Sequence, residues 1–145
     1  MTVTIRLEGS KALQSALRNM SDEVRDEVGK VITSTALELR GDVVKSIQRG
    51  PASGRTYQKY NPRRTHVASA PGQPPMTDTG RLASSIEFDQ RGDLTATVGS
   101  ALVYAVYLEY GTSRMAARPY FRPAIERMRN KFNRRLEAAI GGATR

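Results

Sequence analysis

The sequence contains no cysteine, and its 145 residues include a single histidine. Disulfides and thiolate metal sites are therefore excluded, which fits a reducing compartment. No apolar run approaches the roughly 20 residues that a membrane span requires. The first ten residues, MTVTIRLEGS, lack the basic start and apolar block of a secretory signal. We therefore expect a soluble protein without a membrane partner, made and used without export.

Catalytic motifs are also missing. No nucleophile-elbow, phosphate-loop or zinc-protease pattern occurs. His66 has no carboxylate or other ligand near it in the sequence, so we interpret it as a surface histidine. Glu87 and Asp89 could form an acid–base pair, but exposed strand positions explain them better. The RGD tripeptide at 91–93 is interpreted as a hairpin turn. The sequence predicts no catalytic, cofactor-binding or metal-binding residue, and hence no enzyme.

The charge that is present is unevenly distributed. The formal net charge is +9, yet residues 1–48 are neutral overall, with seven basic and seven acidic groups. Residues 49–81 carry +5 and residues 114–145 carry +7, whereas residues 82–113 carry −3. Two basic tracts thus flank a mildly acidic middle. Such a field can attract nucleic acid, or an acidic surface on another copy or another protein.

The first third of the chain has the clearest periodicity. Residues 2–8 alternate apolar and polar side chains, which predicts a half-buried strand, and residues 9–20 indicate a short helix. From an N-cap at Ser21, apolar residues then recur every three or four positions up to a stop at Gly50 and Pro51. The pattern predicts a helix of some 27 residues, about 40 Å long.

Glycine and proline mark other features. Gly29 and Gly41 lie inside the long helix, where each is expected to allow close backbone packing. Residues 50–80 contain five of the seven prolines and no sustained apolar period. We expect a long extended basic loop or arm there, ending where Thr77 or Thr79 caps a short turn of helix.

The second half of the chain predicts short elements. Residues 85–99 form a hairpin with Gly92 and Asp93 in its turn, and residues 101–111 form a short helix that Gly111 stops. Pro123 is expected to open a final helix. Strands and helices are segregated, so one α+β domain spanning 1–145 is predicted. Its small antiparallel sheet would be covered on one face by the long helix, leaving exposed edges.

Aromatic and charged residues cluster around residues 104–123. Tyr104, Tyr107 and Tyr110 are spaced as one helix face, which we interpret as buried, with a stacking platform for bases as the alternative. The basic face of the final helix could be solvated or could bind a partner. Glu109 is the lone acid here, and we expect it to pair with Arg114 or Arg118, in this chain or a neighbour.

Two motifs carry a resemblance to a known family. YAVYLEYGTSRMAARPYFRPA matches the pattern Y-A-x-Y-x-E-x-G-T-x-x-x-x-A-R-P-F-x-x-P-A, with Tyr120 where phenylalanine is common. APGQPPMTDTGRLASSI resembles A-P-G-x-P-P…T-G-x-L-x-x-S-I. These motifs, with the long helix before them, are similar to the gene-product-ten-like, HK-type tail-component family of long-tailed phages. The resemblance covers about residues 5–140.

The resemblance implies a virion structural protein at the head–tail junction or the top of the tail. During assembly such a protein would be in the host cytoplasm. It implies a tail-completion, tail-terminator or neck-joining role, with tail-tube and neck or connector proteins as partners. Such proteins usually form a ring, commonly six-fold. In such a ring the acidic residues 82–113 of one copy would face the basic residues 114–145 of the next. The subunit interface would then use an elbow formed by Tyr104, Tyr107, Glu109, Gly111, Thr112, Arg114, Arg118, Pro119, Tyr120 and Pro123.

The basic loop has two possible uses. In a ring it would order on a neighbour or line the DNA channel, where its cations would contact phosphate without reading sequence: Arg55, Lys59, Arg63 and Arg64. The alternative function is a stand-alone basic nucleic-acid-binding domain, with the loop and the last helix as its footprint.

Overall fold

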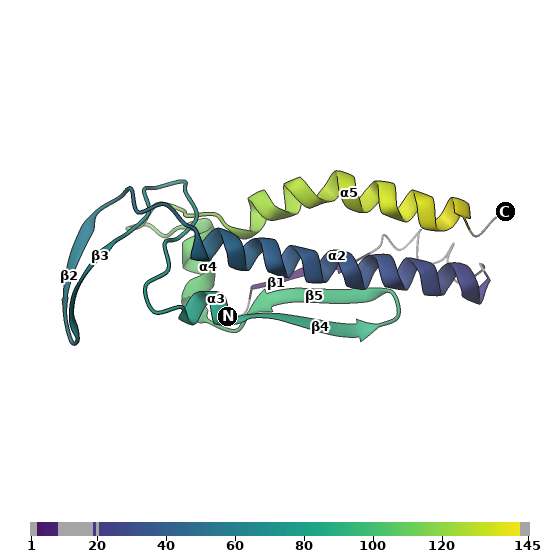
Figure 1. The fold of residues 1–145 in the computed structure, drawn as a ribbon, viewed down its shortest axis with the longest axis horizontal. Coiled ribbons are helices and arrows are strands. Elements are labelled where there is room, and N and C mark those ends of the chain that lie inside the picture. The colour runs from purple at the N-terminus through teal and green to yellow at the C-terminus, as the bar shows by residue number, and fades with distance from the viewer. Residues whose placement is uncertain (1–2, 9–18, 20, 143–145) are drawn as a thin grey trace.

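A long helix, α2, forms the middle layer of the fold (Figure 1). The computed structural model describes residues 3–8, 19 and 21–142. The helix predicted at residues 9–20 therefore lies outside the described residues, apart from residue 19. The α+β class is confirmed by the elements, which in chain order are β1 (Val3–Glu8), α2 (Asp22–Gln48), β2 (Thr56–Tyr60), β3 (Arg63–Val67), α3 (Arg81–Ser84), β4 (Ile86–Gly92), β5 (Thr95–Ser100), α4 (Val103–Tyr110) and α5 (Phe121–Gly142).

The bounds of α2 agree with its sequence pattern. Ser21 occupies the N-cap position, but its hydroxyl makes no capping hydrogen bond. Instead, the negative charges of Asp22 and Glu23 in the first turn stabilise the helix by interacting with the positive end of its dipole. The buried face follows the predicted spacing of three and four, and consists of Val24, Val28, Ile32, Thr35, Ala36, Leu39, Val43 and Ile47.

The sheet has the strand order β1–β5–β4, and both pairings are antiparallel. Ser100 of β5 pairs with Val3 on one side and with Ile86 on the other. Helix α2 packs on one face of this sheet, and α5 lies on the far side of α2 (Figure 1). The predicted arrangement, a small sheet covered on one face by the long helix, is confirmed. Among the described strands, β1 and β4 lie at the two edges of the sheet, each with a single partner.

Glu38 holds α5 along α2. Its carboxylate lies 2.7 Å from Nη2 of Arg135 and 2.6 Å from Nζ of Lys131. The hydrogen bond from Arg135, and then that from Lys131, lowers the pKa of Glu38 below its usual value. Part of the basic face of α5 therefore forms ion pairs within the chain. Two of its cations, Lys131 and Arg135, bind Glu38 of the same chain.

The two glycines inside α2 differ. A Cβ on Gly29 would lie 2.8 Å from the backbone oxygen of Asp93, so the close approach expected there is confirmed. A Cβ on Gly41 would meet no atom within 4 Å, so the same prediction is wrong for Gly41. Its position in the helix faces no neighbouring backbone.

The segment predicted as a long loop contains a hairpin. Strands β2 and β3 pair with each other, in a two-stranded sheet of their own. We call residues 54–68 the arm, because Figure 1 shows this hairpin extending from the end of the molecule beyond α2. Sequence periodicity missed both strands because neither packs on the core. One face of the arm is exposed and the other is only half-buried, so no apolar alternation is required.

Candidate assembly surface

The elbow between α4 and α5 is built around one buried carboxylate. Glu109 is 1% exposed. Its Oε2 accepts hydrogen bonds from the backbone N–H groups of Tyr120 at 2.9 Å and Phe121 at 3.0 Å. Its Oε1 accepts the N–H of Arg122 at 2.9 Å. One side chain of α4 therefore holds the start of α5.

This contact satisfies a general requirement of helix ends. The first N–H groups of a helix have no partner within it, and they favour an anion. At α5 three of them go to Glu109, and the next residue, Pro123, has no N–H to satisfy. Pro123 was predicted to open the helix, but α5 begins two residues earlier, at Phe121.

Within the chain Glu109 pairs with neither Arg114 nor Arg118. Arg118 is turned toward the base of the arm, where its Nε donates to the backbone oxygen of Ser69 at 3.2 Å. The backbone N–H of Arg118 donates to the oxygen of Leu108 at 2.6 Å. Hydrogen bonds from backbone N–H groups replace the expected ion pair of Glu109, because buried N–H groups need a nearby acceptor. The long side chain of Arg118 finds its acceptor at Ser69 instead.

A tight turn connects the two helices. Gly111 has a φ of 77°, in the left-handed region that favours glycine. Thr112 and Met115 then form an isolated antiparallel bridge, and the N–H of Thr112 lies 2.8 Å from the oxygen of Met115. Arg114, at the tip of this turn, is exposed. The prediction that Gly111 ends the short helix is confirmed.

The tyrosine face of α4 is exposed, so its interpretation as a buried face is wrong. Tyr104, Tyr107 and Tyr110 are 39%, 47% and 61% exposed. The opposite face, which carries Ala105 and Glu109, is buried. Glu109 must point inward to reach the start of α5, and this orientation turns the tyrosines outward. The base-stacking alternative for these rings stays a prediction.

Tyr120 is, after Glu109, the second predicted interface residue that is buried. It is 1% exposed, and its hydroxyl donates to the backbone oxygen of Ala105 at 3.2 Å. Burial, and then the charge of Glu109, raises the pKa of Tyr120 well above its usual value. Its ring also lies 5.0 Å from that of Phe121. Tyr120 therefore supports the elbow from inside and cannot be a contact surface.

The base of the arm is held by Asp78, which sequence reasoning missed. Its Oδ1 lies 3.0 Å from Nη2 of Arg64 and 3.6 Å from Nδ1 of His66, and its Oδ2 accepts a hydrogen bond from Lys59. The hydrogen bond from Lys59, with the charge of Arg64, lowers the pKa of Asp78. His66 is thus half-buried beside a carboxylate, contrary to its interpretation as a surface residue. The one available signal was that Asp78 is the lone acid in residues 49–81.

The four cations expected to contact DNA are divided by this cluster. Lys59 and Arg64 lie directly opposite each other in the hairpin and share Asp78. Arg55 stacks over the ring of Tyr57, 5.5 Å from its centroid. Arg63 is exposed and has no ion pair within the described part of the chain. Only two of the four therefore lack a carboxylate partner.

Replacing Asp78 with asparagine is expected to loosen the arm and leave the core unchanged. Without the carboxylate, Lys59 and Arg64 repel each other across the strands. Because folding lowers the pKa of Asp78, its contribution is complete above the unfolded pKa and is lost as the pH falls through the lowered one. Several-fold faster tryptic cleavage in residues 54–68 at neutral pH would show the effect. Acidification of the unchanged protein should speed hydrogen exchange there similarly, once corrected for its intrinsic pH dependence.

The matched control is Asp93→Asn, an exposed aspartate in the β4–β5 turn. It should leave cleavage of the arm unchanged. Equal cleavage of the Asp78 variant and the control would contradict the assigned role.

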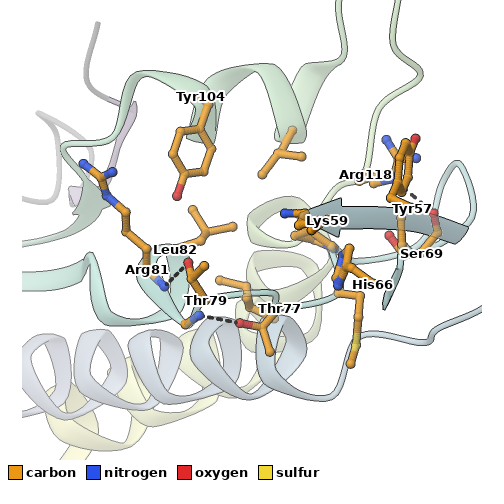
Figure 2. Close-up of a pocket in the computed structure, with 16 residues that line it drawn as sticks. Tyr57, Lys59, His66, Ser69, Thr77, Thr79, Arg81, Leu82, Tyr104 and Arg118 are labelled. Atoms are coloured by element: carbon orange, nitrogen blue, oxygen red, sulfur yellow. Dashed lines mark hydrogen bonds between the residues drawn. The ribbon is translucent and has the colours of Figure 1, made fainter. Parts of the chain in front are cut away.

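A cleft of about 360 Å³ lies where the arm meets the body (Figure 2). Ile47, Leu82 and Leu108 supply apolar lining, and Figure 2 places Lys59 and Arg118 toward the arm side. None of the described residues that line the cleft carries a carboxylate. The lining also includes Ser69, Thr77 and Thr79. The hydroxyls of Thr77 and Thr79 accept hydrogen bonds from the N–H groups of Gly80 and Arg81, respectively, at the start of α3. An apolar floor beside cations can hold an acidic polypeptide segment.

Within the described ranges no three His, Cys, Asp or Glu side chains are grouped so that they could bind a metal ion. None of the described helices is both long and apolar enough to cross a membrane.

Comparison with known proteins points to a phage family. A family model described as "Bacteriophage HK97-gp10, putative tail-component" matches residues 11–111. This range includes the long helix, the arm, the sheet hairpin and α4. No curated protein and no solved structure matches the chain.

Proposed function

The chain belongs to the HK97-gp10-like family of bacteriophage tail components, and from this premise we propose that it is a ring subunit at the head–tail junction or the top of the tail. Membership of a tail-component family implies a structural role in the virion. The proposed ring has six copies and completes or terminates the tail, or joins it to the neck. Its partners are tail-tube and neck or connector proteins, and it assembles in the host cytoplasm.

The observation that carries the proposal is an exposed aromatic surface at one end of the molecule. Five tyrosines are well exposed: Tyr57, Tyr60, Tyr104, Tyr107 and Tyr110. They lie on β2 and α4, which Figure 1 places at the same end. Tyrosine and arginine are enriched at protein interfaces, and large exposed apolar surfaces mark binding sites. A neighbouring subunit would remove these rings from water.

The elbow has two roles in this proposal. Its exposed members supply contacts: Tyr104, Tyr107, Thr112 and Arg114. The other predicted elbow residues set the angle at which those contacts are presented: Glu109, Gly111, Arg118, Pro119, Tyr120 and Pro123. A closed ring requires a constant angle between successive copies, so a rigid elbow suits the function.

The burial and ion pairs of charged residues change the contact expected between copies. An acidic surface from residues 82–113 was expected to face the basic residues 114–145 of the next copy. Glu109 is buried, and Lys131 and Arg135 are engaged with Glu38. The acidic groups left exposed in 82–113 are therefore those of the β4–β5 hairpin. In a ring the two arm cations without a carboxylate partner, Arg55 and Arg63, would either contact DNA without sequence preference or contact a neighbouring copy.

The experiment is to measure the mass of the purified protein over a concentration series and to image it by negative stain. Rings, together with the protein in purified phage particles, are expected. Inactivating the gene should leave filled heads and tails that do not join. A monomer at every concentration that is also absent from particles would overturn the proposal.

The alternative, a stand-alone nucleic-acid-binding domain, gives a different result in a salt titration. Tight DNA binding by the monomer, with a steep dependence on salt, would support it. The carboxylate of Asp78 beside Lys59 and Arg64 argues against this alternative, because it neutralises part of the basic arm.

A further inference from the structure

The described part of the chain has open strand edges on both of its sheets. β1 and β4 each pair only with β5, and the two strands of the arm pair only with each other. Open edges are templates for pairing with another chain. A two-stranded hairpin without further packing is also only marginally stable in water. The arm therefore gains more from a third strand than any other element of the fold.

The arm and β4 carry opposite charges. Residues 53–67 contain four Lys or Arg residues and no Asp or Glu. On β4, Glu87, Asp89 and Arg91 are exposed and share one face, because they are spaced two residues apart. Nε of Arg91 lies 2.7 Å from Oδ2 of Asp89, so Glu87 is the acid of this face that has no ion pair within the described residues. Arg63 of β3 lies on the exposed face of the arm. It is paired across the hairpin with Tyr60, which is 79% exposed. Opposite charges on neighbouring strands stabilise their pairing.

The other edge of the main sheet offers no such attraction. The sequence of β1, VTIRLE, contains one arginine and one glutamate, so its charges cancel. Of the two edges of this sheet, β4 is therefore the one that complements the arm.

The arm cannot pair with the open edge of β4 in its own chain. Arg118 and Asp78 anchor its base, and Figure 1 shows the hairpin extending away from the sheet, beyond the end of α2. The two edges can therefore meet only between copies. A contact between two different surfaces is heterologous, the type that closes into rings.

We propose that β3 of the arm adds to the open edge of β4 in the next copy, extending its sheet to the order β1–β5–β4–β3–β2. This deepens the proposed ring and rests on it. Backbone hydrogen bonds between β3 and β4 supply affinity, as in other cases of strand addition. Arg63 facing Glu87 of β4 selects the partner edge. The five residues of β3 can pair along their whole length with the seven-residue β4.

The test uses a charge exchange between Arg63 and Glu87 in the full-length protein. Arg63→Glu and Glu87→Arg, each alone, should weaken self-association at least about tenfold, since each places like charges together. The double variant should recover most of it. Native mass spectrometry and sedimentation measure the association. Arg129→Glu, an exposed arginine on α5, is the matched control and should associate normally.

Mixing the two single variants provides a stricter test. The acid introduced by Arg63→Glu then faces the base introduced by Glu87→Arg at one interface, and unchanged Arg63 faces unchanged Glu87 at the next. Two proteins that associate poorly alone should therefore form mixed rings with equal numbers of each. Both positions are exposed, so unchanged thermal unfolding of the separate variants would show that folding is intact.

Several outcomes separate this inference from the proposed function. Rings formed equally well by both single variants would overturn strand addition but leave the ring subunit standing. Failure of the mixture to recover association would overturn it as well. Loss of DNA retention by Arg63→Glu with normal rings would identify the arm as a DNA contact and overturn it too. No rings from the unchanged protein, with absence from particles, would overturn both.

Discussion

Replacing Glu109 with alanine is expected to lower the free energy of unfolding by about 3–5 kcal/mol. The change removes the acceptor of three backbone N–H groups at the start of α5. Each buried donor left without a partner costs about 1–3 kcal/mol. For a chain of this length, the melting temperature should fall by about 10 °C. Chemical denaturation and thermal unfolding measure both quantities.

Glu109→Gln tests the same contact with little change in shape. Glutamine keeps one acceptor oxygen, but its NH₂ group faces an N–H donor, so a loss of about 2–3 kcal/mol is expected. The control is Glu126→Gln on α5, an exposed acid, which should change stability by less than about 0.5 kcal/mol. Should Glu109→Ala cost no more than this control, the carboxylate would not be what holds the elbow.

Replacing Gly111 with alanine is expected to cost about 2–4 kcal/mol. The φ of 77° is unfavourable for any residue with a Cβ. That Cβ would also lie 2.8 Å from both the nitrogen of Ala117 and the oxygen of Met115. Both are backbone atoms, so the turn must move, and the angle between α4 and α5 should change with it. Urea unfolding measures the loss, and ring formation reports the altered angle.

Replacing Gly41 with alanine should raise the stability, whereas the same change at Gly111 lowers it. Gly41 lies inside α2, and a Cβ there would have no atom within 4 Å of it. Alanine should raise stability by about 0.5–1 kcal/mol, because it restricts the unfolded chain and favours the helix. A loss of stability at Gly41, or none at Gly111, would contradict the assigned roles of these glycines.

Elements that pack on the core were predictable from the sequence. The apolar spacing in α2 and α5, and the alternation in β4, arise because one face of each element is buried. The central strand β5 buries residues of both faces, including the consecutive Ala96, Thr97 and Val98. The arm shows the limit of this signal. Its strands bury no apolar face, so their sequence has no reason to alternate, and residues 56–67 resembled a loop.

Polar contacts were the least predictable features. The sequence marks Glu109 as a lone acid but does not say whether an arginine or a helix end will reach it. The contact with Tyr120, Phe121 and Arg122 follows from where α5 begins, two residues before the predicted start. Asp78 likewise meets Lys59 only because the hairpin folds back toward the loop that follows it.

The sequence by itself determined the α+β class, the bounds of α2, the turn at Gly111 and the similarity to phage tail components. These depend on local backbone preferences, on periodic burial and on motifs contiguous in the chain. Only the tertiary structure decided that the α4 tyrosines face outward, that Glu109 binds the start of α5, and that the arm is a hairpin with open edges. Each of these depends on which groups from distant segments compete for the same partner, and a one-dimensional pattern does not encode that competition.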